Sequence, residues 1–247
     1  MTTPDIAILD ADIIAYKAAC WATTNEATLN QLQDRLKFDV EYWTPPGLSR
    51  RVLAFSCSRV DNYRKDYWPT YKDNREGKPA PPLLGLCKKI LSSCDKVIQK
   101  PRLEADDLIG IGMGTMTMIG VSLDKDLMSC PGWFWNPDKM DFPMLISQDI
   151  ADYCFHKQWL MGDSTDNIPG IPKIGKVKAE RYLKDVSPSN RTALVMKLYE
   201  EKDLDLAYCL SQARCVRILR LGEWDKTTGK HVPWCPSWAL TPESKRN

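Results

Sequence analysis

The sequence predicts an α/β fold with a mostly parallel central sheet, on three observations. Apolar, strand-like runs alternate with helix-like segments through the first 150 residues. Two of these runs, DIAILD and MIGVSLD, end at Asp10 and Asp124, as suits the carboxyl edge of a parallel sheet, where binding sites form. Beyond residue 150 the pattern becomes mostly helical. We therefore expect an α/β core at 1–150 and a mainly helical part at 151–247.

Hydrophobic periodicity, and the residues that interrupt it, predict the individual elements. The chain opens with a buried strand that leads into a helix, over residues 5–20. Helical spacing recurs in three segments: 26–42, 83–95 and 104–118. Strand-like runs occupy 51–58, 96–100 and 118–124, and FWNP suits a further short strand. The polar tail at 222–247 predicts a hairpin around Thr228 and Gly229.

Residues 59–82, the arch segment, have little apolar periodicity and end in KPAPP, which breaks regular structure. We expect a long, mobile excursion from the core. Within it, aromatic residues such as Tyr71 alternate with Lys and Arg, a pattern suited to stacking on unpaired bases beside a charged backbone. A structural aromatic cluster is the alternative interpretation.

Composition bounds the class of protein. Hydrophobic residues make up 43% of the 247 and charged residues 27%, which is ordinary for a globular chain. The N-terminal apolar run is too short and too charged to span a membrane, and it lacks the basic start of a signal peptide. Nine scattered Cys without a CxxC pair, and only two His, argue against disulfides and zinc. We expect a reduced, cytoplasmic protein.

The net charge of +2 conceals two basic regions. Residues 50–89 hold ten Lys or Arg against four acids, and residues 173–184 hold five against one. Such runs are the electrostatic footprint of a polyanion binder, although a solvated face explains either run alone.

Acidic residues fall in four tight groups at the edges of predicted elements: Asp10 and Asp12; Glu104, Asp106 and Asp107; Asp124 and Asp126; Asp163 and Asp166. Any single group could be a helix cap, a first-turn acid or an Asx turn. Brought together, these carboxylates would repel one another unless hard cations lay between them. The four groups together predict Mg²⁺ or Mn²⁺ and phosphodiester hydrolysis.

The segment IPGIPKIGKVKAERYL predicts a grip on one DNA strand. Gly170 and Gly175 allow tight turns and close backbone approach, and the amides of the helix after Gly175 can hold a phosphate. The expected DNA contacts also include cations of the same run: Lys173, Lys176, Lys178 and Arg181. An ordinary helix–turn–helix connector is the alternative.

The ordered motifs EADD, LDKD and GDSTDNIPGIPKIG, with PTYKDNR before them, resemble the 5′→3′ exonuclease and flap-endonuclease family, which includes stand-alone phage exonucleases and the 5′-nuclease domain of bacterial DNA polymerase I. The resemblance covers nearly the whole chain. It implies a PIN-like α/β core that includes the arch at about 59–82, a helical arch, and a helix–three-turn–helix motif at 163–183.

The resemblance also implies roles for individual residues. The first of two or more divalent ions would be held by Asp10, Glu104 and Asp106. The second would be surrounded by Asp107, Asp124, Asp126, Asp163 and Asp166. Lys72 and Arg75 would contact the scissile phosphate, with Arg64 nearby. The sequence departs from the family at one position. Ser56 or Cys57 stands where the family usually has Asp, and Asp12 is the candidate to supply the missing carboxylate.

The predicted activity is therefore metal-dependent 5′→3′ exonuclease or 5′-flap cleavage of DNA, in phage replication or recombination within a bacterial host. Two alternatives remain open at this point. One is RNase H-like removal of RNA primers from RNA–DNA hybrids. The other is a non-catalytic protein that holds branched DNA. The oligomeric state is not determined by the sequence, with a monomer favoured.

Overall fold

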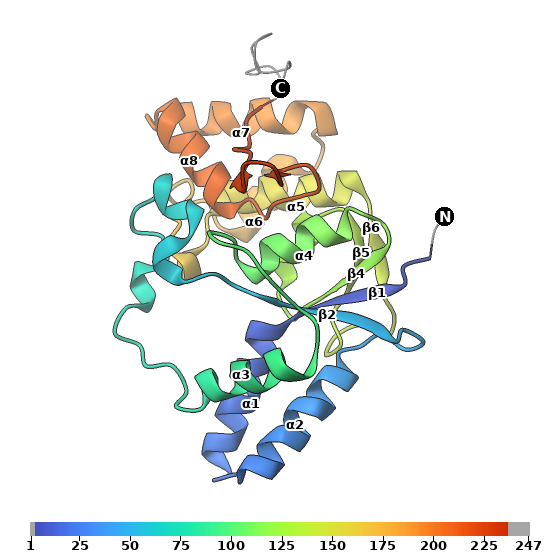
Figure 1. Cartoon of the computed structure of the whole chain (residues 1–247). Coiled ribbons are helices and arrows are strands. Elements are labelled where there is room, and N and C mark those ends of the chain that lie inside the picture. The colour runs from blue at the N-terminus through green and yellow to red at the C-terminus, as the bar shows by residue number, and fades with distance from the viewer. Residues whose placement is uncertain (1–2, 237–247) are drawn as a thin grey trace.

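The computed structural model describes residues 3–236 and is built around a six-stranded, mostly parallel sheet (Figure 1). The strands lie in the order β3-β2-β1-β4-β5-β6, and only β6 runs antiparallel to its neighbour. Their bounds are Ile6–Asp10 (β1), Arg50–Phe55 (β2), Val97–Gln99 (β3), Met118–Val121 (β4), Gly132–Trp135 (β5) and Met144–Ile146 (β6). The predicted α/β class and parallel sheet are confirmed.

Strand β1 lies at the centre, paired with β2 on one side and β4 on the other. Its side chains alternate between the two faces of the sheet. Ala7 and Leu9 join one hydrophobic cluster, and Ile8 joins another on the opposite face. Because β1, β2 and β4 are parallel, their carboxyl ends meet at one edge, where Asp10 ends β1.

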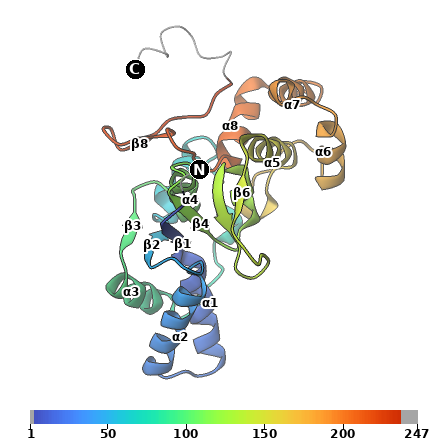
Figure 2. The same cartoon turned by 90° about the vertical axis from the view of Figure 1, so that its right-hand side faces the viewer.

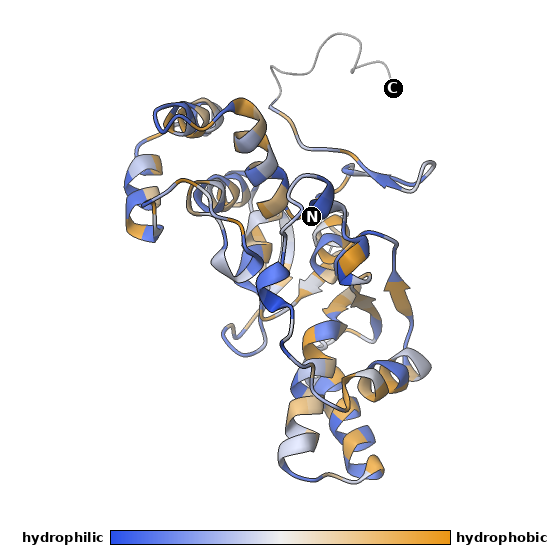
Figure 3. Ribbon diagram, turned by 90° about the vertical axis from the view of Figure 1, so that its left-hand side faces the viewer, coloured by the Kyte–Doolittle hydropathy of each residue, from blue (hydrophilic) through white to orange (hydrophobic). Residues whose placement is uncertain are grey.

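Helices cover both faces of the sheet (Figures 1 and 3). One face is covered by α1 (Ala11–Thr24), α2 (Leu29–Tyr42) and α3 (Leu84–Cys94). Helix α4 (Ala105–Met113) covers the other. Thr28 and Gln31 form a capping box at the start of α2. Figure 3 shows α1–α3 in both colours, hydrophobic and hydrophilic, as expected of helices with one buried side.

The C-terminal half is helical, as predicted, and its helices gather away from α1–α3 (Figure 2). They are α5 (Gln148–Met161), α6 (Lys176–Leu183), α7 (Arg191–Glu200) and α8 (Leu206–Val216). A hairpin follows, formed by β7 (Trp224–Asp225) and β8 (Lys230–His231), with Gly229 at φ 66° in its turn. This confirms the predicted hairpin. No helix between residues 3 and 236 combines the length and apolarity needed to cross a membrane.

One predicted boundary was wrong, and one strand was not predicted. The helix expected at 104–118 ends at Met113, because Gly114 caps it and a turn precedes β4. Strand β6, which no pattern indicated, pairs with β5 at the edge of the sheet.

The division near residue 150 stays a prediction. Tyr71 of the arch segment packs in the same hydrophobic cluster as Phe155 and Trp159 of α5.

The arch segment is less of an excursion than expected. It contains three short 3-10 helices and no α-helix: Arg59–Asp61, Tyr63–Asp66 and Asp73–Arg75. Three side chains of the segment are buried: Tyr63, Arg64 and Tyr71. The segment is therefore anchored to the helical half through its own aromatic side chains, and the structural interpretation of that aromatic pattern is correct for these rings.

Candidate functional site

A cleft of about 1000 Å³ opens at the carboxyl edge of the sheet, between it and the helical half. Eight of the nine acidic residues singled out in the sequence line it: Asp10, Asp12, Glu104, Asp106, Asp124, Asp126, Asp163 and Asp166. Topology explains this convergence. Asp10 and Asp124 follow parallel strands, α4 brings its first turn to the same edge, and the loop after α5 supplies the last pair.

One part of the cleft concentrates carboxylates whose mutual repulsion and burial outweigh the nearby cations. Burial and the nearby Asp12 raise the pKa of Asp10 to about 7. Burial, with Asp10 and Asp124 close by, raises the pKa of Asp106 well above its usual value. The pKa of Asp126 rises to about 6 through burial and the charges of Asp124 and Asp163. Each shift means that these carboxylates resist ionisation together.

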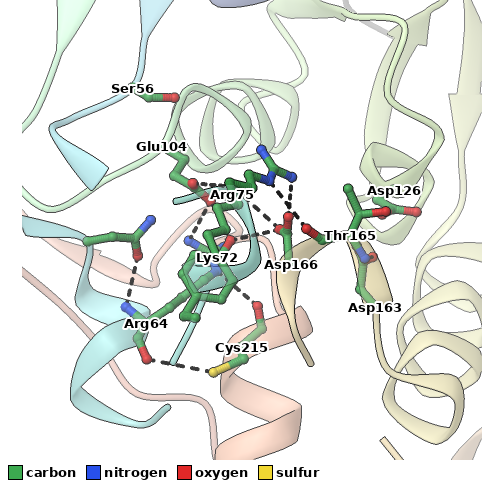
Figure 4. Close-up of polar contacts among 12 residues, drawn as sticks. Ser56, Arg64, Lys72, Arg75, Glu104, Asp126, Asp163, Thr165, Asp166 and Cys215 are labelled. Carbon is green, nitrogen blue, oxygen red and sulfur yellow. Dashed lines mark hydrogen bonds and ion pairs between the residues drawn. The ribbon is translucent and has the colours of Figure 1, made fainter. Parts of the chain in front are cut away.

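The other part is neutralised by the arch segment (Figure 4). The Lys72 ammonium donates to Glu104 and lies 3.4 Å from Asp166, and the Arg75 guanidinium donates to Asp166. Burial alone would raise the pKa of Glu104, but Lys72 and Arg64 hold it at about 2. The backbone of Lys72 is in the left-handed region at φ 60°, and its N–H donates to the Asp166 carbonyl at 2.9 Å. The arch thus delivers two cations among the carboxylates.

Several carboxylates also accept hydrogen bonds from the backbone of the turn or helix that they begin. The alternative interpretation of these acids as helix caps or Asx turns is therefore correct in part. Asp10 accepts from the Ile13 N–H, at the start of α1. Asp124 accepts from the Asp126 N–H, and Asp163 from the Thr165 N–H. These bonds fix the direction of each side chain, which is what a preorganised site needs.

Asp107 is not in the cleft, and its predicted role as a metal ligand is wrong. It is fully buried and accepts two hydrogen bonds from Arg64, at 2.8 and 2.7 Å. The backbone N–H groups of Glu104 and Leu219 donate to it as well. Its oxygens are therefore occupied by structural contacts on the far side of α4.

Arg64, which the resemblance places near the scissile phosphate, lies 3.4 Å from Glu104 with its donor groups engaged inside the protein. Besides Asp107, it donates to the carbonyls of Cys215 and Arg217, at 2.9 and 2.8 Å, and only 2% of it is exposed. Figure 4 shows it on the Cys215 side of the site, below Lys72. Arg64 lines the wall of the cleft with almost no exposed surface, and its contacts anchor the arch.

Tyr71 was expected to stack on bases, and this is also wrong. Its ring is 1% exposed, and its hydroxyl group donates towards Glu104 and Asp166, at 2.8 and 2.9 Å. Its role is to hold the two carboxylates that Lys72 neutralises. Sequence periodicity gave no sign of this, because the partners lie far away along the chain.

The segment after α5 forms a compact turn that presents α6 to the cleft. Asp163 and Ile168 exchange backbone hydrogen bonds at 2.7 and 2.8 Å. Gly170 does not face DNA as predicted. It is buried at φ 62°, and an added Cβ would lie 2.3 Å from the Gly162 nitrogen. Gly175, in contrast, is exposed at the start of α6 with open space around it.

The cations of this segment point to solvent. The structure leaves four of them exposed: Lys173, Lys176, Lys178 and Arg181. Lys176 and Gly175 also line the cleft. The predicted contacts of these four cations with DNA therefore stay predictions, with nothing in the fold that blocks them.

Sequence reasoning missed three polar residues of the site. The Ser122 hydroxyl donates to Asp10 at 2.8 Å and accepts from the Asp124 N–H at 3.0 Å. Ser122 could have been identified from the sequence, because it lies at a strand end two residues before Asp124. Gln158 of α5 donates to Asp126 at 2.8 Å, and Lys157 lines the cleft nearby. No local pattern marks these two.

The chemistry of the donors fits a divalent cation. Asp106 Oδ1 is buried and has no hydrogen-bond partner, within a group of carboxylates that repel one another. Oxygen donors are those that Mg²⁺ and Mn²⁺ prefer. Among residues 3–236, no three His, Cys, Asp or Glu side chains are arranged to hold an ion as they stand. Lys72 and Arg75 occupy part of that space, so ion binding requires local rearrangement.

No family model matches this chain. Curated relatives do. A 5′-3′ exonuclease of Buchnera aphidicola (subsp. Acyrthosiphon pisum) is 32% identical over 156 residues, which cover 55% of this chain and 52% of the relative. The exodeoxyribonuclease of enterobacteria phage T3 is 31% identical over 145 residues, 54% of this chain and 46% of that protein. The resemblance to the 5′→3′ exonuclease family is confirmed. The chain spans about half the length of these relatives.

Solved 5′-exonuclease structures share the fold. The T5 D15 protein, co-crystallised with metal ions, superposes with a TM-score of 0.61 at 12% identity, over 85% of this chain and 88% of that one. The T5 5′-exonuclease with bound zinc gives a TM-score of 0.59 at 13% identity, over the same shares. At such low identity the match supports the architecture alone.

Proposed function

We propose that this protein is a divalent-metal-dependent nuclease that hydrolyses DNA phosphodiester bonds at or near a 5′ end. The observation that supports it most is the cleft itself. Eight carboxylates line one opening together with Lys72, Arg75 and the exposed start of α6. The structurally similar T5 5′-exonuclease, solved with bound zinc ions, is consistent with this activity.

The chain's own residues divide the work. Asp10, Asp106, Asp124 and Asp126 would hold Mg²⁺ or Mn²⁺, and Glu104, Asp163 and Asp166 would complete the coordination of two or more ions. Bound ions of this kind supply Lewis-acid stabilisation of phosphate charge and a more acidic water.

Lys72 and Arg75 are placed to stabilise the charge that develops on the phosphate. Both are paired with Glu104 and Asp166, and each can turn to a phosphate once another cation balances those carboxylates. The amides at the start of α6, with Lys176 beside them, would hold a phosphate further along the same strand.

The test is cleavage of 5′-labelled duplex DNA, a matched 5′-flap substrate and an RNA–DNA hybrid, in Mg²⁺, in Mn²⁺ and in EDTA. We expect metal-dependent cleavage of DNA, with product length separating exonuclease from flap cutting. Lys72→Met should lower the cleavage rate by about a hundredfold or more, since it removes one charge-stabilising donor.

Lys17→Met is the matched control, because Lys17 pairs with Asp138 outside the cleft. It should cleave at the wild-type rate. Faster cleavage of the hybrid than of either DNA would favour primer removal instead. Tight DNA binding with no cleavage in either metal would contradict the proposal and favour a DNA-holding protein.

A further inference from the structure

The strands that end at the carboxyl edge of the sheet do not all carry a carboxylate there. Strands β1 and β4 are followed by Asp10 and Asp124, but the residue after β2 is Ser56. Ser56 also lines the cleft, at the end of the strand next to β1. Its hydroxyl group accepts from the Ala105 N–H at 3.0 Å, which ties the end of β2 to the first turn of α4. The β2 end therefore has a fixed backbone and no charge of its own.

A carboxylate from a neighbouring helix reaches this position. Asp12, in the first turn of α1, accepts a hydrogen bond from the Ser56 backbone N–H at 2.8 Å. Its other oxygen accepts from the Lys88 ammonium of α3 at 2.5 Å. The Asp12 side chain is 23% exposed and lines the cleft together with Asp10.

Asp12 therefore does more than balance Lys88. A surface ion pair of this kind stabilises a protein little. This one is held by a backbone donor and lines the same cleft as Asp106, whose Oδ1 is buried without a hydrogen-bond partner.

We propose that Asp12 supplies the metal-binding carboxylate at the β2 end of the cleft, and that the Ser56 backbone N–H positions it there. This inference rests on the proposed function in one respect only, namely that the cleft binds divalent ions. In the protein without metal, Lys88 neutralises Asp12, as Lys72 neutralises Glu104.

The experiment is a Mn²⁺ titration of the full chain without DNA, followed by the EPR signal of free Mn²⁺. Asp12→Asn keeps an oxygen that can accept from Ser56 and removes only the charge. We expect it to weaken the tightest Mn²⁺ site about tenfold or more. Asp138→Asn is the control, because it breaks a comparable ion pair with Lys17 that lies outside the cleft, and it should leave Mn²⁺ affinity unchanged.

A rescue variant separates a ligand from a structural role. Asp12→Asn combined with Ser56→Asp returns a carboxylate to the β2 end, and we expect it to recover most of the lost Mn²⁺ affinity. Thermal unfolding in EDTA checks that each variant folds. Wild-type affinity in Asp12→Asn, or no Mn²⁺ binding by the wild-type chain, would overturn the inference. Because no DNA is present, the result is independent of whether the protein cuts.

Discussion

Arg64 and Asp107 form a buried, two-pronged ion pair that joins the arch segment to the helix carrying Glu104 and Asp106. Both side chains are at most 3% exposed, and their donor–acceptor distances are 2.8 and 2.7 Å. Asp107 also accepts from the Leu219 N–H, and Arg64 donates to the Cys215 carbonyl. Three distant segments therefore meet at one pair of side chains.

Removal of one partner from this pair should strongly lower the free energy of unfolding. Arg64→Met would leave Asp107 as an uncompensated buried charge, so we expect the free energy of unfolding to fall by about 3–5 kcal/mol, measured by urea denaturation. Arg102→Met breaks an exposed pair with Asp66 and should cost at most about 1 kcal/mol. A fully stable Arg64→Met protein that had lost only cleavage would contradict this structural role and place Arg64 in the cleavage reaction.

Asp106→Asn should make the metal-free protein more stable and the metal-loaded protein inactive. Its Oδ1 has no partner, and Asp10 and Asp124 repel its charge, so an amide relieves strain that a carboxylate causes. Thermal unfolding at pH 8 should show a higher Tm in EDTA and a smaller rise on addition of Mn²⁺. Asp61→Asn, which changes an exposed acid of the arch, should alter neither value. A lower Tm for Asp106→Asn in EDTA would count against this account.

Stability without metal should decrease as the pH rises towards 7. The pKa of Asp10 goes from 3.8 to about 7 on folding, mainly through burial, so the folded chain keeps a proton that the unfolded chain has lost. Its contribution is complete below pH 3.8 and disappears as the pH passes about 7, a loss of at most about 4 kcal/mol. Urea unfolding in EDTA across this range should show a shallower fall for Asp10→Asn. Equal slopes for the two proteins would refute the assignment.

The two glycines of the segment after α5 should respond differently to alanine. At Gly170 a Cβ would meet the Gly162 nitrogen at 2.3 Å, and φ is 62°, so Gly170→Ala should cost about 1–3 kcal/mol or more of unfolding free energy. At Gly175 no heavy atom lies within 4 Å of an added Cβ. Gly175→Ala should fold normally and change only DNA affinity, measured by fluorescence anisotropy. Equal destabilisation by both would mean that Gly175 is structural too.

Local patterns were enough to place the sheet and the edge at which the acids gather. Strand-like runs predicted β1, β2, β3 and β4, and parallel strands put the acids that follow them on one side. Asp10, Asp124 and Asp126 reach the cleft for this reason, and the first turns of α1 and α4 and the loop after α5 bring the other five acids to the same edge. The hydrophobic period of a segment and the order of segments along the chain depend only on residues that are close together in sequence. Both can therefore be identified without a structure.

What each polar residue contacts was decided only by the tertiary structure. Asp106 and Asp107 are adjacent, yet one faces the cleft and the other faces Leu219, 112 residues further along the chain. Tyr71 and Arg64 match a nucleic-acid-binding pattern but are buried by contacts with distant segments. The sequence by itself determined which charges gather at the cleft. Folding determined which of them remain free, because burial and pairing depend on partners that lie far apart in the chain.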